Sequence, residues 1–157
     1  MVKKILFVCL GNICRSPAAE GIFNQKIKER NLENFFVVDS AGTGSWHAGN
    51  LPDQRMRTTA FSRGIELTSR ARQIEANDLY KFDLILVMDK DNLDAVKSLN
   101  KNQNNTINSK IKLILSYLKN SQLDEVPDPY YGGQNGFDKV LDLLDDAMNG
   151  LIDSFMD

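Results

Sequence analysis

Short apolar runs alternate with amphipathic stretches along most of the chain. Three runs rich in β-branched and aromatic residues predict strands at Ile5–Val8, Phe35–Val38 and Phe82–Val87. Because these runs are apolar at nearly every position, we expect both faces of the sheet to be covered, as they are in a parallel sheet. The stretches between the runs have the length of helices, so the pattern predicts parallel strand–helix–strand units.

Amphipathic periodicity predicts four helices. The first spans about Pro17–Arg30, and a proline suits its first turn because the missing N–H has no helical partner there. Two further helices are predicted near Asp53–Arg63 and Lys90–Leu99. The last helix has the clearest pattern, since apolar residues recur at steps of three and four over Phe137–Phe155.

This order of elements indicates an α/β fold. We expect a three-layer sandwich in which helices flank a small twisted parallel sheet, with the functional site at the carboxyl end of the first strand. A length of 157 residues without an internal repeat or linker indicates that residues 1–157 form one domain. The amide-rich residues 100–108 predict a solvated loop.

The apolar run at Ile5–Leu10 follows two lysines, as in a short signal peptide. Its six residues are fewer than the usual ~7–15 of a signal sequence, which favours a buried first strand.

Charge and cysteine content narrow the function classes. A net charge of −2 and a pI near 5.4 exclude the basic surface of a protein that binds nucleic acid or anionic membranes, and no stretch predicts a transmembrane helix. Cys9 and Cys14 are too few for a disulfide scaffold, and the single histidine, His47, argues against a metal site. We expect a cytoplasmic protein without metal or other cofactor. We also expect a monomer or a weak dimer.

The most specific chemistry lies in the loop between the first predicted strand and helix. Residues 8–17 read Val-Cys-Leu-Gly-Asn-Ile-Cys-Arg-Ser-Pro, with Cys9 at the strand end and Arg15 at the loop end. A loop that enters a helix N-terminus directs backbone amides at one point and binds anions there. We expect Cys9 to be a thiolate in this site and Arg15 to grip two phosphate oxygens at once. The pattern predicts phosphoryl transfer through a cysteine.

The other residues of the loop favour the same interpretation. Gly11 permits a close backbone approach, and Asn12 tolerates a left-handed conformation. Ser16 has a hydroxyl that can donate to the Cys9 sulfur, and the loop amides would hold the phosphate charge in the transition state. The loop residues expected to contact the substrate are Leu10, Gly11, Asn12, Ile13, Cys14 and Ser16. The alternative for Cys9, taken alone, is a buried structural thiol.

A second motif supplies the acid that a leaving alkoxide or phenolate needs. Residues 126–133 read Val-Pro-Asp-Pro-Tyr-Tyr-Gly-Gly, in which two prolines stiffen the chain around Asp128. Asp128 is therefore the candidate general acid. Tyr130 and Tyr131 would line a slot for a flat ring. The alternative is a turn with two surface tyrosines.

With these motifs, the chain resembles the low-molecular-weight protein tyrosine phosphatases over essentially its whole length. Val8–Pro17 resembles the phosphate-binding loop of that family, and Asp128–Tyr131 resembles its general-acid loop. Asp39–Thr43 and Met88–Asp89 also resemble family segments. Two distant and chemically complementary motifs in the right order make the resemblance specific.

The resemblance implies a two-step reaction on phosphotyrosine-containing proteins. Cys9 would attack phosphorus while Asp128 protonates the phenolate, and Asp128 would then activate the water that hydrolyses the cysteinyl-phosphate. It also implies that Asn12, Ser16 and Ser40 hold the loop and the thiolate. No metal or cofactor is implied.

Residues around the two motifs receive weaker assignments. The resemblance places Trp46 on the rim of the cleft, where it would enclose the substrate ring with the two tyrosines. His47 is expected to be a solvated loop residue, and Asp53 and Asp89 are expected to be helix-start or surface carboxylates. Ser69 stands where several family members carry a histidine, which leaves open whether the buttressing hydrogen-bond network of the family forms here.

Other readings remain open at this point. Relatives that act on phosphoarginine typically carry threonine in place of Ile13 and lack the paired tyrosines. Arsenate reductases of similar fold use late cysteines, whereas no cysteine follows Cys14. A phosphotyrosine-binding module without activity would be expected to lose one of the catalytic residues Cys9, Arg15 and Asp128.

Cys14 either fills space or, as the resemblance implies, pairs with Cys9 to shield it from oxidation.

Overall fold

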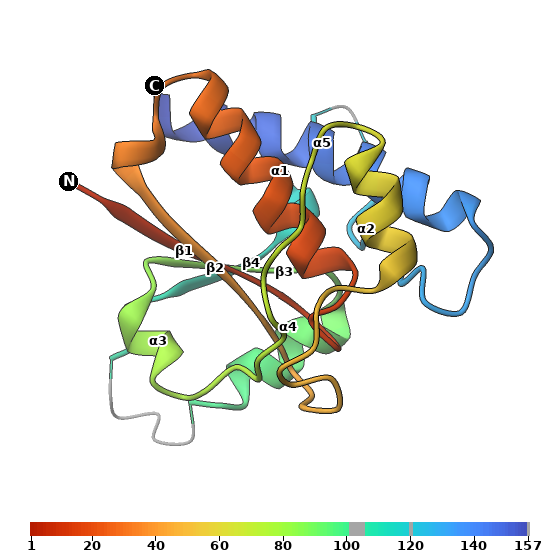
Figure 1. Ribbon diagram of the computed structural model, residues 1–157. Coiled ribbons are helices and arrows are strands. Elements are labelled where there is room, and N and C mark those ends of the chain that lie inside the picture. Colours follow the sequence, from red (N-terminus) through yellow and green to blue (C-terminus); the bar gives the residue numbers. More distant parts are fainter. Residues whose placement is uncertain (101–105, 120, 157) are drawn as a thin grey trace.

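The computed structural model describes residues 1–100, 106–119 and 121–156, which form a parallel sheet with helices on both faces (Figure 1). The four strands of the sheet lie in the order β2-β1-β3-β4, and every neighbouring pair is parallel. Their bounds are Lys3–Cys9 for β1, Phe36–Gly42 for β2, Leu84–Val87 for β3 and Lys110–Leu113 for β4.

The helices divide between the two faces of the sheet. Figure 1 shows α1 and α5 together on one side, with α2 beside them, and α3 and α4 on the opposite side. Their bounds are Arg15–Glu29 for α1, Gln54–Phe61 for α2, Asp78–Lys81 for α3, Lys90–Lys97 for α4 and Asn135–Met156 for α5, with 3-10 turns η1 at Glu33–Phe35 and η2 at Ile114–Tyr117. The predicted three-layer α/β fold is confirmed. None of the helices in the described ranges is long and apolar enough to cross a membrane.

Burial on both faces explains why the strands are apolar at almost every position. Successive residues of β1 point to opposite sides of the sheet. Ile5 and Phe7 pack with α1 and α5 in one core, whereas Leu6 and Val8 pack in a second core on the side of α3 and α4. All four side chains are fully buried.

Two short elements were not predicted from the sequence. β4 is an edge strand of four residues in which exposed lysines alternate with half-buried apolar residues, so it lacks the continuous apolar run that predicted the other strands. α3 is a single turn. It ends just before Phe82, which was predicted to open a strand but is buried in the second core ahead of β3. Part of the predicted loop at 100–108 lies outside the described residues, at positions 101–105.

The topology brings three strand ends to one edge of the sheet. The backbone N–H of Thr43, just after β2, donates to the Cys9 carbonyl at 2.9 Å. The N–H of Met88, just after β3, donates to the Val8 carbonyl at 3.2 Å. The segments that follow β1, β2 and β3 therefore gather around Cys9, as expected for a site at the carboxyl end of a parallel sheet.

We predict that Gly150→Ala destabilises the protein, although alanine favours helices over glycine by about 1 kcal/mol. Gly150 lies inside α5, and an added Cβ there would clash with the backbone carbonyl of Tyr117 in η2. Because backbone cannot give way as a flexible side chain does, we expect a loss of about 1–3 kcal/mol in the free energy of unfolding, measured in urea.

Gly136→Ala is the matched control in the same helix. Its Cβ would lie at an ordinary contact distance, 3.5 Å, from Cβ of Pro129. This variant should be neutral or more stable by up to about 1 kcal/mol. Equal stabilisation by both substitutions would contradict the close packing of α5 on η2.

Candidate active site

The loop after β1 folds back around the Cys9 sulfur. Asn12 adopts a left-handed conformation with φ of 58°, as its residue type allows. The end of β2 lies against the loop, because a Cβ at Gly42 would stand only 2.8 Å from the Leu10 carbonyl oxygen. The chain then enters α1 at Arg15, so the loop amides and the helix N-terminus face the same space.

Two donors face the Cys9 sulfur, which is buried. The backbone N–H of Asn12 donates to it at 3.3 Å, and the Ser16 hydroxyl lies 3.0 Å away. The Asn12 side-chain amide donates to Ser16 Oγ at 2.8 Å, and the Ser16 hydroxyl has two acceptors within reach, the Cys9 sulfur at 3.0 Å and the Ala41 carbonyl at 3.4 Å. The sulfur therefore lies where the loop and the first turn of α1 meet.

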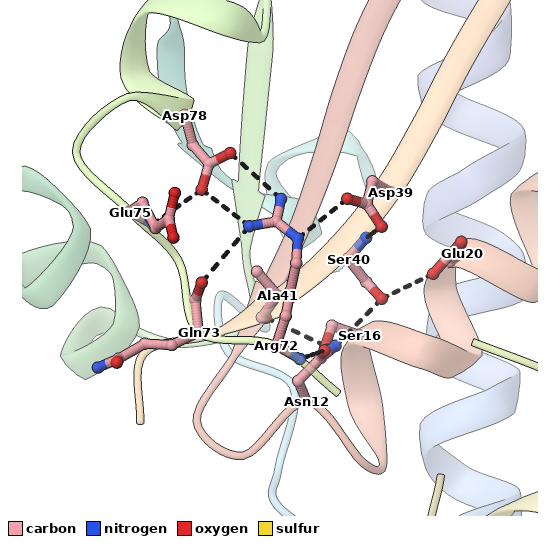
Figure 2. Close-up of polar contacts among 10 residues, drawn as sticks. All are labelled: Asn12, Ser16, Glu20, Asp39, Ser40, Ala41, Arg72, Gln73, Glu75 and Asp78. Carbon is pink, nitrogen blue, oxygen red and sulfur yellow. Dashed lines mark hydrogen bonds and ion pairs between the residues drawn. The ribbon is translucent and has the colours of Figure 1, made fainter. Parts of the chain in front are cut away.

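Behind the loop, the Asn12 side chain is bonded at both its nitrogen and its oxygen (Figure 2). Its nitrogen also donates to Ser40 Oγ at 3.0 Å, and its oxygen accepts from the backbone N–H of Arg72 at 3.0 Å. Ser40 in turn donates to Glu20 Oε1 at 2.6 Å. A buttressing network therefore exists without the family histidine, and it is made by Glu20, Ser40 and Arg72.

The Arg72 side chain anchors the segment that supports Asn12. Figure 2 shows its guanidinium between two carboxylates. Nε lies 3.1 Å from Asp39 Oδ2, while Nη1 and Nη2 lie 3.0 and 3.2 Å from the two oxygens of the buried Asp78. Asp78 also accepts from the backbone N–H of Glu75 at 2.8 Å. The sequence carries no local signal for this anchor, because Asp39 lies 33 residues before Arg72.

Glu20 carries a carboxyl group with a displaced pKa. Burial raises this pKa above its ordinary value, while the hydrogen bond from Ser40 opposes the rise. The negative charge of Asp39 adds to the rise, and the positive charge of Arg72 works against it. The net result is a carboxyl that holds its proton to higher pH than an exposed glutamate does.

Arg15 is a buried cation whose two terminal nitrogens both face carboxylates. Its Nη1 lies 2.7 Å from Asp89 Oδ2 and donates to the Val126 carbonyl at 3.0 Å, while Nη2 lies 3.5 Å from Asp128 Oδ2. Burial lowers its pKa, but the negative charges of Cys9 and the two aspartates outweigh this and raise the pKa overall. Arg15 therefore stays charged and oriented.

Asp53 and Asp89 lie at the starts of helices, as predicted. Asp53 caps α2, and Asp89 caps α4 by accepting from the backbone N–H of Asn92 at 2.8 Å. The second carboxylate oxygen of Asp89 holds Arg15, a contact the sequence analysis did not foresee. The signal available in the sequence was the position of Asp89, two residues after a strand that ends at the site.

Cys9, Arg15 and Asp128 border one cavity of about 320 Å³. It is lined by Cys9, Leu10, Gly11, Ile13, Cys14, Arg15, Trp46, His47, Asp128, Tyr130 and Tyr131. The three predicted catalytic residues thus come together. Trp46 and Tyr131 form an exposed rim at 71% and 90% exposure, whereas Asn12, Ser16 and Ser40 lie behind the loop.

His47 lies closer to the cavity than predicted, and Cys14 is buried. His47 was expected to be a solvated loop residue, but it lines the cavity with its ring centroid 6.2 Å from that of Tyr130. Cys14 is a free thiol, as is Cys9. Burial, followed by the charge of Asp53, raises the pKa of Cys14 far above its ordinary value, so this sulfur stays protonated near neutral pH. Over the parts of the chain that the structure covers, no three His, Cys, Asp or Glu side chains are grouped so as to hold a metal ion.

The cavity brings together a cysteine beside a helix N-terminus, a buried arginine and a carboxyl group, which are the groups that a cysteine-dependent phosphatase requires. A family model described as low molecular weight phosphotyrosine protein phosphatase matches residues 4–156. The chain belongs to this family.

Individual relatives agree with this assignment. A relative from Synechocystis sp. is 49% identical over 151 residues, which are 96% of this chain and 95% of its own. The crystal structure of YfkJ from Bacillus subtilis, named a low molecular weight protein-tyrosine-phosphatase, superposes with a TM-score of 0.90 at 38% identity, covering 99% of this chain and 96% of its own. The Drosophila arginine phosphatase DARP superposes with a TM-score of 0.92 at 32% identity, covering 98% of each chain.

We predict that Glu20→Gln stabilises the protein relative to the parent, and more so as the pH rises. Glutamine keeps an oxygen that accepts from Ser40 and carries no charge. In the parent, the folded state binds the Glu20 proton more tightly than the unfolded chain does, so stability falls as pH rises through the raised pKa. At about pH 4, below the ordinary glutamate value, both states are largely protonated and the two proteins should differ least.

The measurement is urea unfolding of parent and variant at several values between about pH 4 and pH 7. A difference in unfolding free energy that stays constant, or that shrinks toward pH 7, would contradict the raised pKa.

Proposed function

We propose that this protein hydrolyses phosphotyrosine in proteins through a cysteinyl-phosphate intermediate. One observation carries the proposal. The Cys9 sulfur with its two donors, the Nη2 edge of Arg15 and the Asp128 carboxyl border the same cavity. Nucleophile, phosphate clamp and proton donor are the three groups that this chemistry requires.

In the first step, the phosphate dianion binds to the loop amides and to Arg15. The Cys9 thiolate attacks phosphorus, so that an S–P bond forms while the P–O bond to the tyrosine breaks. Asp128 gives its proton to the departing phenolate oxygen, which leaves as a neutral phenol. The loop donors hold the charge on the equatorial oxygens throughout.

In the second step, the Asp128 carboxylate takes a proton from a water molecule, which attacks phosphorus. The S–P bond breaks, and inorganic phosphate and the Cys9 thiolate are released. The Ser16 hydroxyl and the backbone N–H of Asn12 stabilise the thiolate as it leaves phosphorus. Their contacts with the Cys9 sulfur support this role.

The cavity walls support an aromatic substrate. Ile13 lines the cavity from the loop, while Trp46, Tyr130 and Tyr131 surround its mouth, so a phenyl ring would lie against apolar surface. The likeness to the Drosophila arginine phosphatase keeps phosphoarginine as a second candidate substrate. The absence of any cysteine after Cys14 in the sequence argues against the arsenate reductase relay.

The proposal includes phosphotyrosine-containing proteins as partners, a cytoplasmic location and a monomer or weak dimer. The two free thiols, Cys9 and Cys14, support a reducing compartment.

The first test is phosphate release from a phosphotyrosine peptide with EDTA present. The parent should turn over the peptide at the same rate with and without EDTA. Cys9→Ser should release no phosphate, and Asp128→Asn should lose about 10²–10⁴-fold in kcat. Tight peptide binding by the parent without phosphate release would instead indicate a binding module.

The second test compares phosphotyrosine and phosphoarginine peptides of matched sequence. We expect the parent to prefer phosphotyrosine, because the Ile13 side chain offers the substrate only apolar contact. Ile13→Thr introduces a hydroxyl that can accept from a guanidinium, and it should shift the ratio of kcat/KM toward phosphoarginine by about tenfold or more. An unchanged ratio would mean that Ile13 does not select the substrate.

A further inference from the structure

We propose that Arg55 is a positioning residue that fixes the segment carrying Asp128 onto the first turn of α2. The inference rests on the proposed function, in which Asp128 is the general acid. Arg55 does not line the cavity, and no feature of the sequence singled it out. Arg55 contacts the acid segment directly, and its ion-pair partner Asp53 contacts the phosphate-binding loop.

Toward the acid segment, the Arg55 guanidinium holds Tyr130 in two ways. Nη2 donates to the Tyr130 carbonyl at 3.1 Å, and Cζ lies 5.3 Å from the centre of the Tyr130 ring. Cζ also lies 4.8 Å from the ring of the buried Phe137, in the first turns of α5. A guanidinium over two aromatic rings gains cation–π attraction from both.

The guanidinium is itself fixed by Asp53. Nε lies 3.1 Å from Asp53 Oδ1, and Nη2 lies 2.9 Å from Oδ2, which is a two-point contact. The same carboxylate caps α2 by accepting from the backbone N–H groups of Arg55 and Met56. The Arg55 fork is therefore preorganised by the helix cap, in a geometry that lysine cannot reproduce.

Toward the phosphate-binding loop, the backbone N–H of Asp53 donates to the Ile13 carbonyl at 2.8 Å. Residues 53–55 thus bond to the loop that carries the nucleophile through one group and to the segment that carries the acid through another. This short capped turn therefore links the two segments, in addition to the contacts of Arg15 with Val126 and Asp128.

Asp128 depends on this support because few other contacts fix it. One carboxylate oxygen accepts from the backbone N–H of Tyr130 at 3.0 Å, and the other lies 3.5 Å from Arg15 Nη2. Its side chain is about one third exposed, at 34%. When Tyr130 loses its attachment, the backbone N–H that holds this carboxyl is no longer fixed.

A second attachment keeps the segment folded when Arg55 is replaced. Gln134 Nε2 donates to Thr59 Oγ1 at 2.9 Å, one turn further along α2. Replacement of Arg55 should therefore loosen the segment near Asp128 without unfolding the protein.

The kinetic test compares Arg55→Gln with Arg57→Gln, a control on the same helix whose Nε donates to the Pro52 carbonyl instead. For phenyl phosphate, whose leaving group needs a proton, kcat/KM should fall about tenfold in Arg55→Gln, because a misplaced acid transfers its proton poorly. For 2,4-dinitrophenyl phosphate, which leaves without a proton, the loss should stay below about twofold. Arg57→Gln should match the parent on both esters.

A double variant shows whether Arg55 acts through Asp128. In an Asp128→Asn background, Arg55→Gln should cause no further loss of kcat/KM on phenyl phosphate, because the group it positions is already gone. An equal loss on both esters, or a full additional loss in the double variant, would overturn the proposal and assign Arg55 to phosphate binding or to general stability.

Amide hydrogen exchange supplies a readout that does not require activity. Exchange across residues 128–134 should be faster in Arg55→Gln than in the parent and unchanged in Arg57→Gln. If the parent releases no phosphate, the proposed function fails, while faster exchange would still support the attachment. Unchanged exchange in Arg55→Gln would overturn the attachment whatever the activity.

Discussion

The position of the Cys9 sulfur depends on the hydrogen bonds of the Asn12 side-chain amide. The residue is buried in a left-handed conformation, and three hydrogen bonds join its amide to Ser16, Ser40 and the backbone of Arg72. Each bond left unmade at such a depth would cost about 1–3 kcal/mol. The Asn12 amide thus holds Ser16 Oγ beside the Cys9 sulfur.

Two buried or half-buried arginines hold the surrounding frame, each against carboxylates from elsewhere in the chain. Arg15 is bonded to Asp89, and Arg72 is bonded to Asp39 and Asp78. Removing such charges from water is expensive, and pairing returns much of that cost without a large net gain in stability. The main effect of the pairs is therefore to fix the orientation of the two arginine side chains. Asp89 occupies the Nη1 edge of Arg15, which leaves the Nη2 edge facing Asp128 at the cavity.

The sequence predicted the groups proposed to act on phosphorus and, through the family resemblance, the supporting residues Asn12, Ser16 and Ser40, but not the charged groups around them. Cys9 and Arg15 share one short loop with a recognisable strand before it and a helix after it. Asp89, Glu20 and Arg72 matter through contacts between segments far apart in the chain, and a single sequence carries no local signal for such contacts. In the fold, the continuously apolar strands were recognised, whereas the edge strand β4, with its alternating lysines, was not.

The site is complete only when distant parts of the chain have folded together. Arg15 donates to the Val126 carbonyl, 111 residues further along, and the segment after Val126 is attached to α2 and leads into α5. Closing loops of this length costs conformational entropy, which the packing of the intervening elements must offset. Cys9, near the start of the chain, and Asp128, near its end, therefore share one cavity only when the sheet, α2 and α5 are all in place. A partly folded chain would contain the loop but not the complete site.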